Sequence, residues 1–120
     1  MKPTDPTNPL LKKLVEDLKT RGYKEKIPFL IKIAEELSRQ RRRKVEVNVG
    51  KLNRICRENE TVIIPGKVLG YGILNKPVTV AAWKFSKQAI EKIKASGGKT
   101  LSIEELISKN PKGSNVRIIC

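Results

Sequence analysis

The segment from Val78 to Lys84 constrains the fold more than any other part of the chain, because an extended strand here is apolar on both of its faces. One face would carry Val78, Val80 and Ala82, and the other would carry Ala81 and Trp83. A strand with one solvated face alternates apolar and polar residues, whereas a strand covered on both faces does not. We therefore expect this segment at the centre of a sheet that is covered on both sides.

Two helices are predicted near the N-terminus. Asn8 followed by Pro9 is typical of a helix start, with asparagine as the N-cap and proline in the first turn. Leucines follow at helical spacing, and Gly22 is expected to end this helix because glycine readily adopts the left-handed conformation. A second helix begins at about Ile27, so the two should form a hairpin.

The middle of the chain predicts short strands around one helix and one long loop. Valines alternate with polar residues from Val45 to Val49, which indicates a half-buried strand. The inner face of the following helix is predicted to consist of Leu52, Ile55 and Cys56. The β-branched run Val62–Ile64 indicates another strand. Residues 65–77 contain three glycines and two prolines, and are expected to form a loop.

Two capped helices are predicted after the central strand. Ser86 is a typical N-cap, and Gly97-Gly98 should end the helix that it begins. Ser102 and Glu105 have the spacing of a capping box, in which each side chain accepts a hydrogen bond from the other residue's backbone. Residues 116–119 then predict a closing strand.

These elements predict a mixed α/β class: a single compact domain with a small sheet whose short strands alternate with short helices, preceded by an N-terminal helical hairpin. The expected parts are an extended arm at residues 1–7, a helical part at 8–38 and a mixed α/β core at 45–119.

The charge of the chain indicates a polyanionic partner. Lysine and arginine total 26 against 12 acidic residues, which gives a net charge of +14. From Thr61 to Ile90 there is no carboxylate at all, so this stretch can face phosphate without repulsion. Nucleic acid is the expected partner.

Other classes of function are disfavoured by what the sequence lacks. It has no histidine for proton transfer near neutral pH, and the two cysteines are too few for a zinc site. We therefore expect no enzyme, metal, cofactor or small-molecule substrate. Without a long apolar run or a signal-peptide core, we also expect no membrane partner and a cytoplasmic location. Cys56 is interpreted as a buried free thiol.

Three regions are predicted to contact RNA. The first is a cluster rich in arginine, whose planar guanidinium pairs with phosphate and stacks on bases, and the second is the acid-free glycine loop with its flanking lysines. The third is a basic turn near the C-terminus. The predicted RNA-binding residues are Arg39, Arg41, Arg42, Arg43, Lys44, Lys51, Arg54, Lys67, Tyr71, Lys76 and Lys112.

Charge alone leaves an alternative open, an architectural DNA-binding protein of the nucleoid. The scarcity of aromatic residues argues against the stacking platforms of common single-strand-binding domains. Binding by charge and shape, as on folded RNA, fits the composition better.

Four segments resemble one known family. They are Asp5–Pro9 (DPTNP), Val47–Arg54 (VNVGKLNR), Val62–Ile93 (VIIPGKVLGYGILNKPVTVAAWKFSKQAIEKI) and Asn110–Ile119 (NPKGSNVRII). In this order they resemble the archaeal and eukaryotic large-subunit ribosomal protein L-eighteen-e, a relative of bacterial L-fifteen. The resemblance implies a structural component of the large ribosomal subunit, bound to ribosomal RNA and neighbouring ribosomal proteins, with no activity or cofactor of its own.

Overall fold

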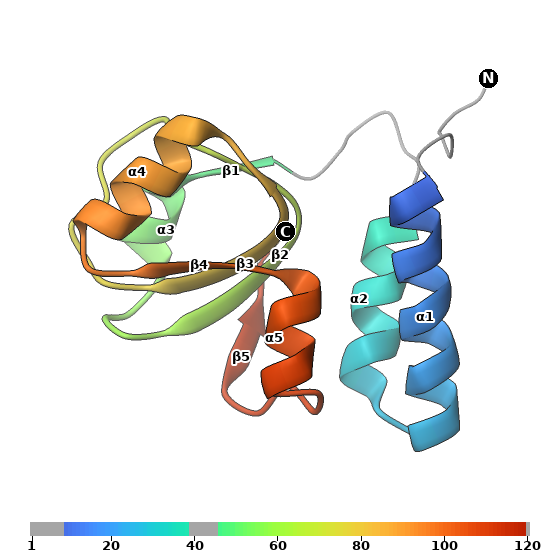
Figure 1. The fold of residues 1–120 in the computed structure, drawn as a ribbon. Helices are drawn as coiled ribbons and strands as arrows, with labels where there is room; N and C mark the ends of the chain where they lie inside the picture. Colours follow the sequence, from blue (N-terminus) through green and yellow to red (C-terminus); the bar gives the residue numbers. More distant parts are fainter. Residues whose placement is uncertain (1–8, 39–45, 120) are drawn as a thin grey trace.

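The computed structural model describes residues 9–38 and 46–119, which form helices and strands in the order shown in Figure 1. The helices are α1 (Pro9–Glu25), α2 (Pro28–Ser38), α3 (Val49–Ile55), α4 (Lys87–Ala95) and α5 (Ile103–Lys109). The strands are β1 (Glu46–Asn48), β2 (Thr61–Leu69), β3 (Thr79–Phe85), β4 (Lys99–Ser102) and β5 (Val116–Ile118). The predicted arm, the arginine cluster at 39–44 and Cys120 lie outside the described residues.

The strands form one parallel sheet in the order β1-β2-β3-β4, and β5 also pairs with β2. β2 is long enough for two neighbours on the same side, since β5 pairs with residues 61–63 and β1 with residues 67–69. β3 lies between β2 and β4. The prediction that residues 78–84 run through the centre of the sheet is confirmed.

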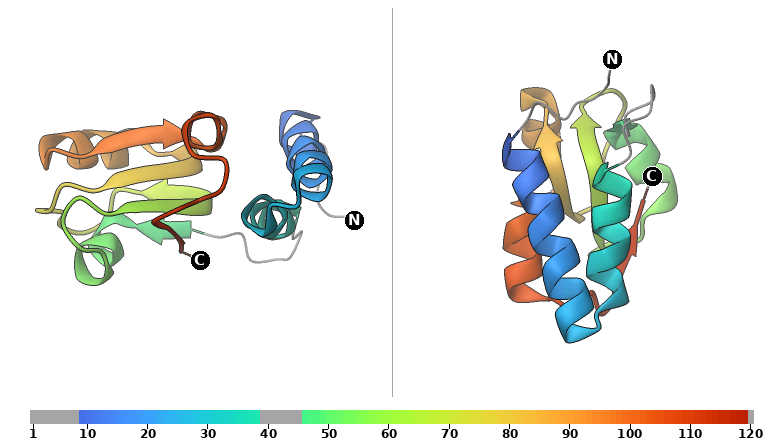
Figure 2. Two further views of the ribbon diagram at one scale, coloured as in Figure 1. Left: turned by 90° about the horizontal axis from the view of Figure 1, so that it is seen from below. Right: turned by 90° about the vertical axis from the view of Figure 1, so that its right-hand side faces the viewer.

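Helices cover both faces of this sheet, as the two-sided apolar pattern of β3 predicts (Figure 2). On one face, Val80 and Ala82 of β3 belong to an apolar cluster with residues of α3 and α4. On the other face, Ala81 belongs to a second cluster with residues of α1, α2 and α5. The mixed α/β class and the N-terminal helical hairpin are therefore confirmed.

The prediction that Gly22 ends the first helix is wrong. α1 continues to Glu25, and the left-handed residue is Lys26 with φ 57°, after which the N–H of Ile27 donates to the carbonyl of Gly22 at 2.8 Å. Gly22 is buried within the helix, and a Cβ there would lie 2.7 Å from Cγ1 of Ile31. The glycine therefore permits close packing of α1 against α2.

The predicted loop at 65–77 is too long, because β2 continues through Pro65 to Leu69. The pairing of β2 with β3 shifts between Ile64 and Lys67, which marks a bulge. Proline has no N–H for the sheet, and a bulge is one of the places where a strand tolerates it. The connection to β3 is therefore residues 70–78.

Three smaller predictions need correction. Val49 begins α3 and does not extend β1, and the side chain of Ile55 is 39% exposed although it was expected to face inward. β4 was not predicted, because its four residues follow a glycine pair and run directly into a capping box. It forms by pairing with residues 79–82 of β3 at the edge of the sheet.

The N-caps predicted at Ser86 and Ser102 are confirmed, whereas the predicted N-cap Asn8 lies outside the described residues. Ser86 accepts a hydrogen bond from the N–H of Ala89, and Ser102 and Glu105 form both hydrogen bonds of a capping box. Gly97, with φ 89°, ends the turn after α4.

Candidate nucleic-acid interface

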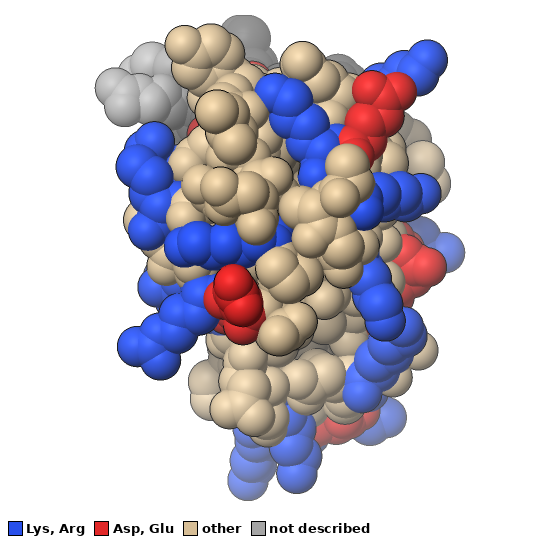
Figure 3. Space-filling model, turned by 90° about the vertical axis from the view of Figure 1, so that its left-hand side faces the viewer, with Lys and Arg blue, Asp and Glu red and all other residues tan. Residues whose placement is uncertain are grey.

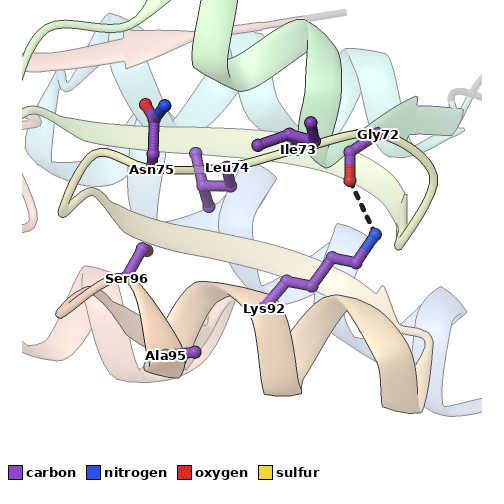
Figure 4. A pocket seen from close by; sticks show the side chains of 7 residues that line it. All are labelled: Gly72, Ile73, Leu74, Asn75, Lys92, Ala95 and Ser96. Carbon is purple, nitrogen blue, oxygen red and sulfur yellow. Dashed lines mark hydrogen bonds between the residues drawn. The ribbon is translucent and has the colours of Figure 1, made fainter.

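Residues 70–78 cross one face of the sheet. Because β2 and β3 are parallel, their connection must return from the carboxyl edge to the amino edge, a task that usually falls to a helix. Here the returning segment is extended and lies between α3 and α4 (Figure 4). Leu74 packs into the core below, whereas Tyr71 and Ile73 are 79% and 73% exposed. We call residues 70–78 the crossing loop.

The crossing loop is fixed by contacts to the helices on either side. On the α3 side, the N–H of Gly50 donates to the carbonyl of Tyr71 at 3.0 Å, and the N–H of Asn75 donates to Oδ1 of Asn53 at 3.0 Å. On the α4 side, Nζ of Lys92 donates to the carbonyls of residues 70 and 72, at 2.7 and 2.6 Å. The loop is thus held in one conformation without a strand partner.

Three of the predicted RNA-binding residues meet at the carboxyl edge of the sheet. Lys67 lies near the end of β2, Tyr71 closely follows β2, and Lys51 is in the first turn of α3, which follows β1. The hydrogen bond from the N–H of Gly50 to the carbonyl of Tyr71 joins α3 directly to the segment that follows β2. Strand ends of a parallel sheet are a common position for ligand contacts.

Two further lysines share this edge but were not among the predicted contacts. Lys84 is the register partner of Lys67 across β2 and β3, and Lys87 is the first residue of α4; both are exposed. They belong to the carboxylate-free stretch from 61 to 90, which is the signal that could have identified them. We call Lys51, Lys67, Tyr71, Lys84 and Lys87 the carboxyl-edge cluster.

The other predicted contacts in the described residues lie elsewhere. Lys76 is at the far end of the crossing loop, where its Nζ donates to the carbonyl of Cys56 at 3.0 Å. Lys112 is exposed in the turn before β5, which pairs with the start of β2 and so lies at the amino edge. Arg54 is exposed in the last turn of α3, between the two edges. Arg39, Arg41, Arg42, Arg43 and Lys44 are outside the described residues.

The turn that carries Lys112 is well ordered by its own hydrogen bonds. The side-chain amide of Asn110 donates to the carbonyl of Ser114 at 2.8 Å, and the N–H of Gly113 donates to the carbonyl of Asn110 at 3.1 Å. A Cβ on Gly113, which has φ 73°, would collide with the ring of Phe29. The turn therefore rests on α2 and holds Lys112 at its tip.

On the face of the molecule on which α3, the crossing loop and α4 lie, basic side chains outnumber acidic ones and lie mostly around the margin of an uncharged surface (Figure 3). Few acidic side chains interrupt it. Acidic groups near the carboxyl-edge cluster include Glu46, which pairs in register with Lys67. A phosphate backbone that approaches this side meets lysine far more often than carboxylate.

The chemistry of the site is that of charge and shape. Among residues 9–38 and 46–119 there is no group of three or more potential metal ligands, and no helix there is long and apolar enough to span a membrane. A shallow groove lies between the crossing loop and α4, with Lys92 on its wall (Figure 4).

Burial raises the pKa of the Cys56 thiol, and the negative charge of Glu60 raises it further. The positive charges of Arg117 and Lys76 act in the opposite direction and lower it.

These features define a small, strongly basic α/β protein with a group of lysines at the carboxyl edge of a parallel sheet. Residues 29–101 match a family described as ribosomal proteins, which comprises 50S-L15, 50S-L18e and one 60S protein. The chain belongs to this family of ribosomal proteins.

Similar curated proteins come from archaea. The chain is 51% identical to the "Large ribosomal subunit protein eL18" of Methanopyrus kandleri, with 98% of this chain and 96% of that protein covered. It is 48% identical to the protein of the same name from Methanococcus maripaludis, with 99% of each covered. The corresponding protein of Archaeoglobus fulgidus is 45% identical over 94% of this chain and 97% of that protein. The family resemblance seen in the sequence is confirmed.

Proposed function

We propose that this protein is a structural constituent of the large ribosomal subunit that binds ribosomal RNA through its basic surface and loops. The similarity to proteins named for the large subunit carries the proposal, because it extends over nearly the whole of both chains. The role needs no catalysis and no cofactor. It places the protein on the ribosome, in the cytoplasm, with neighbouring large-subunit proteins as further partners.

The carboxyl-edge cluster is our candidate for the main RNA contact among the described residues. Its lysines can neutralise phosphates, and the exposed ring of Tyr71 can stack on an unpaired base. Lys112 and Arg54 are candidates for separate contacts, because the fold places them away from this edge. The alternative of a nucleoid DNA-binding protein is not retained, since the relatives named above are all large-subunit proteins.

Salt dependence of binding tests this proposal. The probe is archaeal large-subunit ribosomal RNA transcribed in vitro, titrated with the protein at several salt concentrations. Each phosphate that a lysine neutralises contributes about 0.7 to 0.9 to the slope of log affinity against log salt. Replacing Lys67, Lys84 and Lys87 together by glutamine should therefore reduce the slope by roughly 2 to 3.

The matched control removes the same charge from α1, through glutamine at the exposed Lys12, Lys19 and Lys24. A smaller change in slope for this control supports the carboxyl-edge cluster. Equal changes would mean that binding is a diffuse effect of net charge and would contradict the proposed interface. Co-sedimentation of the wild-type protein with large subunits at moderate salt tests the ribosomal role itself, and recovery only with chromosomal DNA would refute it.

A further inference from the structure

The carbonyl groups at the start of the crossing loop present a structural problem that the fold must solve. Buried or half-buried backbone oxygens need hydrogen-bond donors, and an extended segment without a strand partner has none of its own. The carbonyl of Tyr71 points toward α3 and receives the N–H of Gly50. The carbonyls of Gly70 and Gly72 receive one ammonium group, that of Lys92 on α4.

Lys92 is bound to the backbone of the crossing loop. Its side chain lies under the loop, and Nζ makes two short hydrogen bonds to the residues on either side of Tyr71, of 2.7 Å to the carbonyl of Gly70 and 2.6 Å to that of Gly72. Figure 4 shows the bond to Gly72. Two charge-assisted bonds to backbone carbonyls fix the ammonium in place and leave one of its three N–H groups. Its charge is therefore committed to the protein, while its position controls the loop.

Gly72 tightens the same arrangement from the other side. Its φ of +98° favours glycine, and its Cα packs so closely on Gly50 that a Cβ would lie 2.6 Å from the Cα of that residue. The backbone around Tyr71 is thus held by contacts to both α3 and α4, while Tyr71 itself is 79% exposed. A loop whose backbone is already held in this way loses little backbone entropy when a partner stacks on the Tyr71 ring.

We propose that Lys92 is a positioning residue, which holds the crossing loop so that Tyr71 can stack on an unpaired nucleotide of the ribosomal RNA. This rests on the proposed function. RNA is favoured over a protein partner because the lysines next to Tyr71 suit a phosphate backbone, and the stretch from 61 to 90 has no carboxylate. Lys92 acts through the loop and does not itself neutralise a phosphate.

Two measurements test this with Lys92→Met, which keeps an unbranched side chain out to Cε and removes the ammonium donors. Hydrogen exchange of the free protein should become faster at the amide of Gly50 and across residues 70–75. The affinity of the folded protein for archaeal large-subunit ribosomal RNA should fall by about 5- to 150-fold, the range for loss of one stacked aromatic ring, with an unchanged salt slope. Lys94→Met is the matched control, an exposed lysine on the same helix, and should leave loop exchange unchanged.

A double-mutant cycle with Tyr71→Ala shows whether Lys92 acts through this ring. In the Tyr71→Ala protein, Lys92→Met should cause little further loss of affinity. Additive losses would overturn the proposal, because Lys92 would then not act through Tyr71. A salt slope reduced by about 0.7 to 0.9 with unchanged loop exchange would also overturn it and make Lys92 a phosphate contact. Unchanged RNA affinity with poorer incorporation into reconstituted subunits would overturn it in favour of a protein partner. If the wild-type protein does not bind the RNA, the proposed function is refuted. Independently of that result, unchanged hydrogen exchange of the loop in Lys92→Met would refute the role of Lys92 in holding the loop.

Discussion

The contact between Gly72 and Gly50 predicts an unusually large effect of one methyl group. Gly72→Ala combines two penalties. The φ of +98° is unfavourable for alanine, which costs about 1–2 kcal/mol in the left-handed region. The new Cβ would also lie 2.6 Å from Cα and 2.9 Å from N of Gly50, atoms of the backbone that cannot rotate away.

Forcing extra atoms into a packed contact typically costs about 1–3 kcal/mol, so the sum is about 2–5 kcal/mol if the loop stays in place. The loop can also escape by detaching from α3, which sacrifices the hydrogen bond from Gly50 to the Tyr71 carbonyl and the fit of the loop on Lys92. The observed loss of stability follows whichever response costs less. In either case the loop around Tyr71 is disturbed.

Gly97→Ala is the matched control, since Gly97 has a similar φ, +89°. A Cβ there would lie 3.6 Å from Cβ of Pro77, an ordinary contact. This variant should therefore lose about 1–2 kcal/mol from conformation alone. Urea unfolding of both variants measures the difference, and equal losses of unfolding free energy would refute the argument that close approach adds to the strain at Gly72.

Two further predictions concern the capping box and the buried thiol. Ser102→Ala removes the acceptor for the N–H of Glu105 and should lower the free energy of unfolding by about 1 kcal/mol. The control Ser108→Ala, on the exposed face of α5, should change this free energy little. Equal urea midpoints for the two variants would contradict the stabilising role of the cap. Because burial raises the pKa of the Cys56 thiol in the fold, the stability it contributes is complete below the ordinary thiol pKa of about 8.5 and declines as the pH rises above it. The wild type should therefore lose stability relative to Cys56→Ala as the pH rises above about 8.5 in urea titrations, and parallel curves would refute this.

The parts of the fold that the sequence predicted well are those encoded by local or strictly periodic signals. The two-sided apolar run of β3 requires cover on both faces, and the caps at Ser86 and Ser102 need only their own neighbours three residues on. These signals keep their meaning whatever the rest of the chain does. These signals could therefore be interpreted correctly from the sequence alone.

The errors arose where tertiary contacts decide between two uses of the same residue. Gly22 looks like a helix terminator but is a contact point between α1 and α2, and Pro65 looks like a loop residue but occupies a bulge in β2. β4 forms because it can pair with the edge of β3, and no pattern within the four residues of β4 predicts this pairing. No local pattern distinguishes these alternatives.

The candidate site shows the same limit for charge. The sequence showed that residues 61–90 lack carboxylates, but it could not separate cations that face solvent from cations that the fold uses. Lys92 serves two carbonyls of the crossing loop, and Lys76 serves the carbonyl of Cys56, the residue that directly follows α3. Arg117 donates to the carbonyl of Ile55 and to the carboxylate of Glu60. A count of basic residues therefore overestimates the number of phosphates that the protein neutralises, and the salt dependence of RNA binding should be shallower than the net charge of +14 suggests.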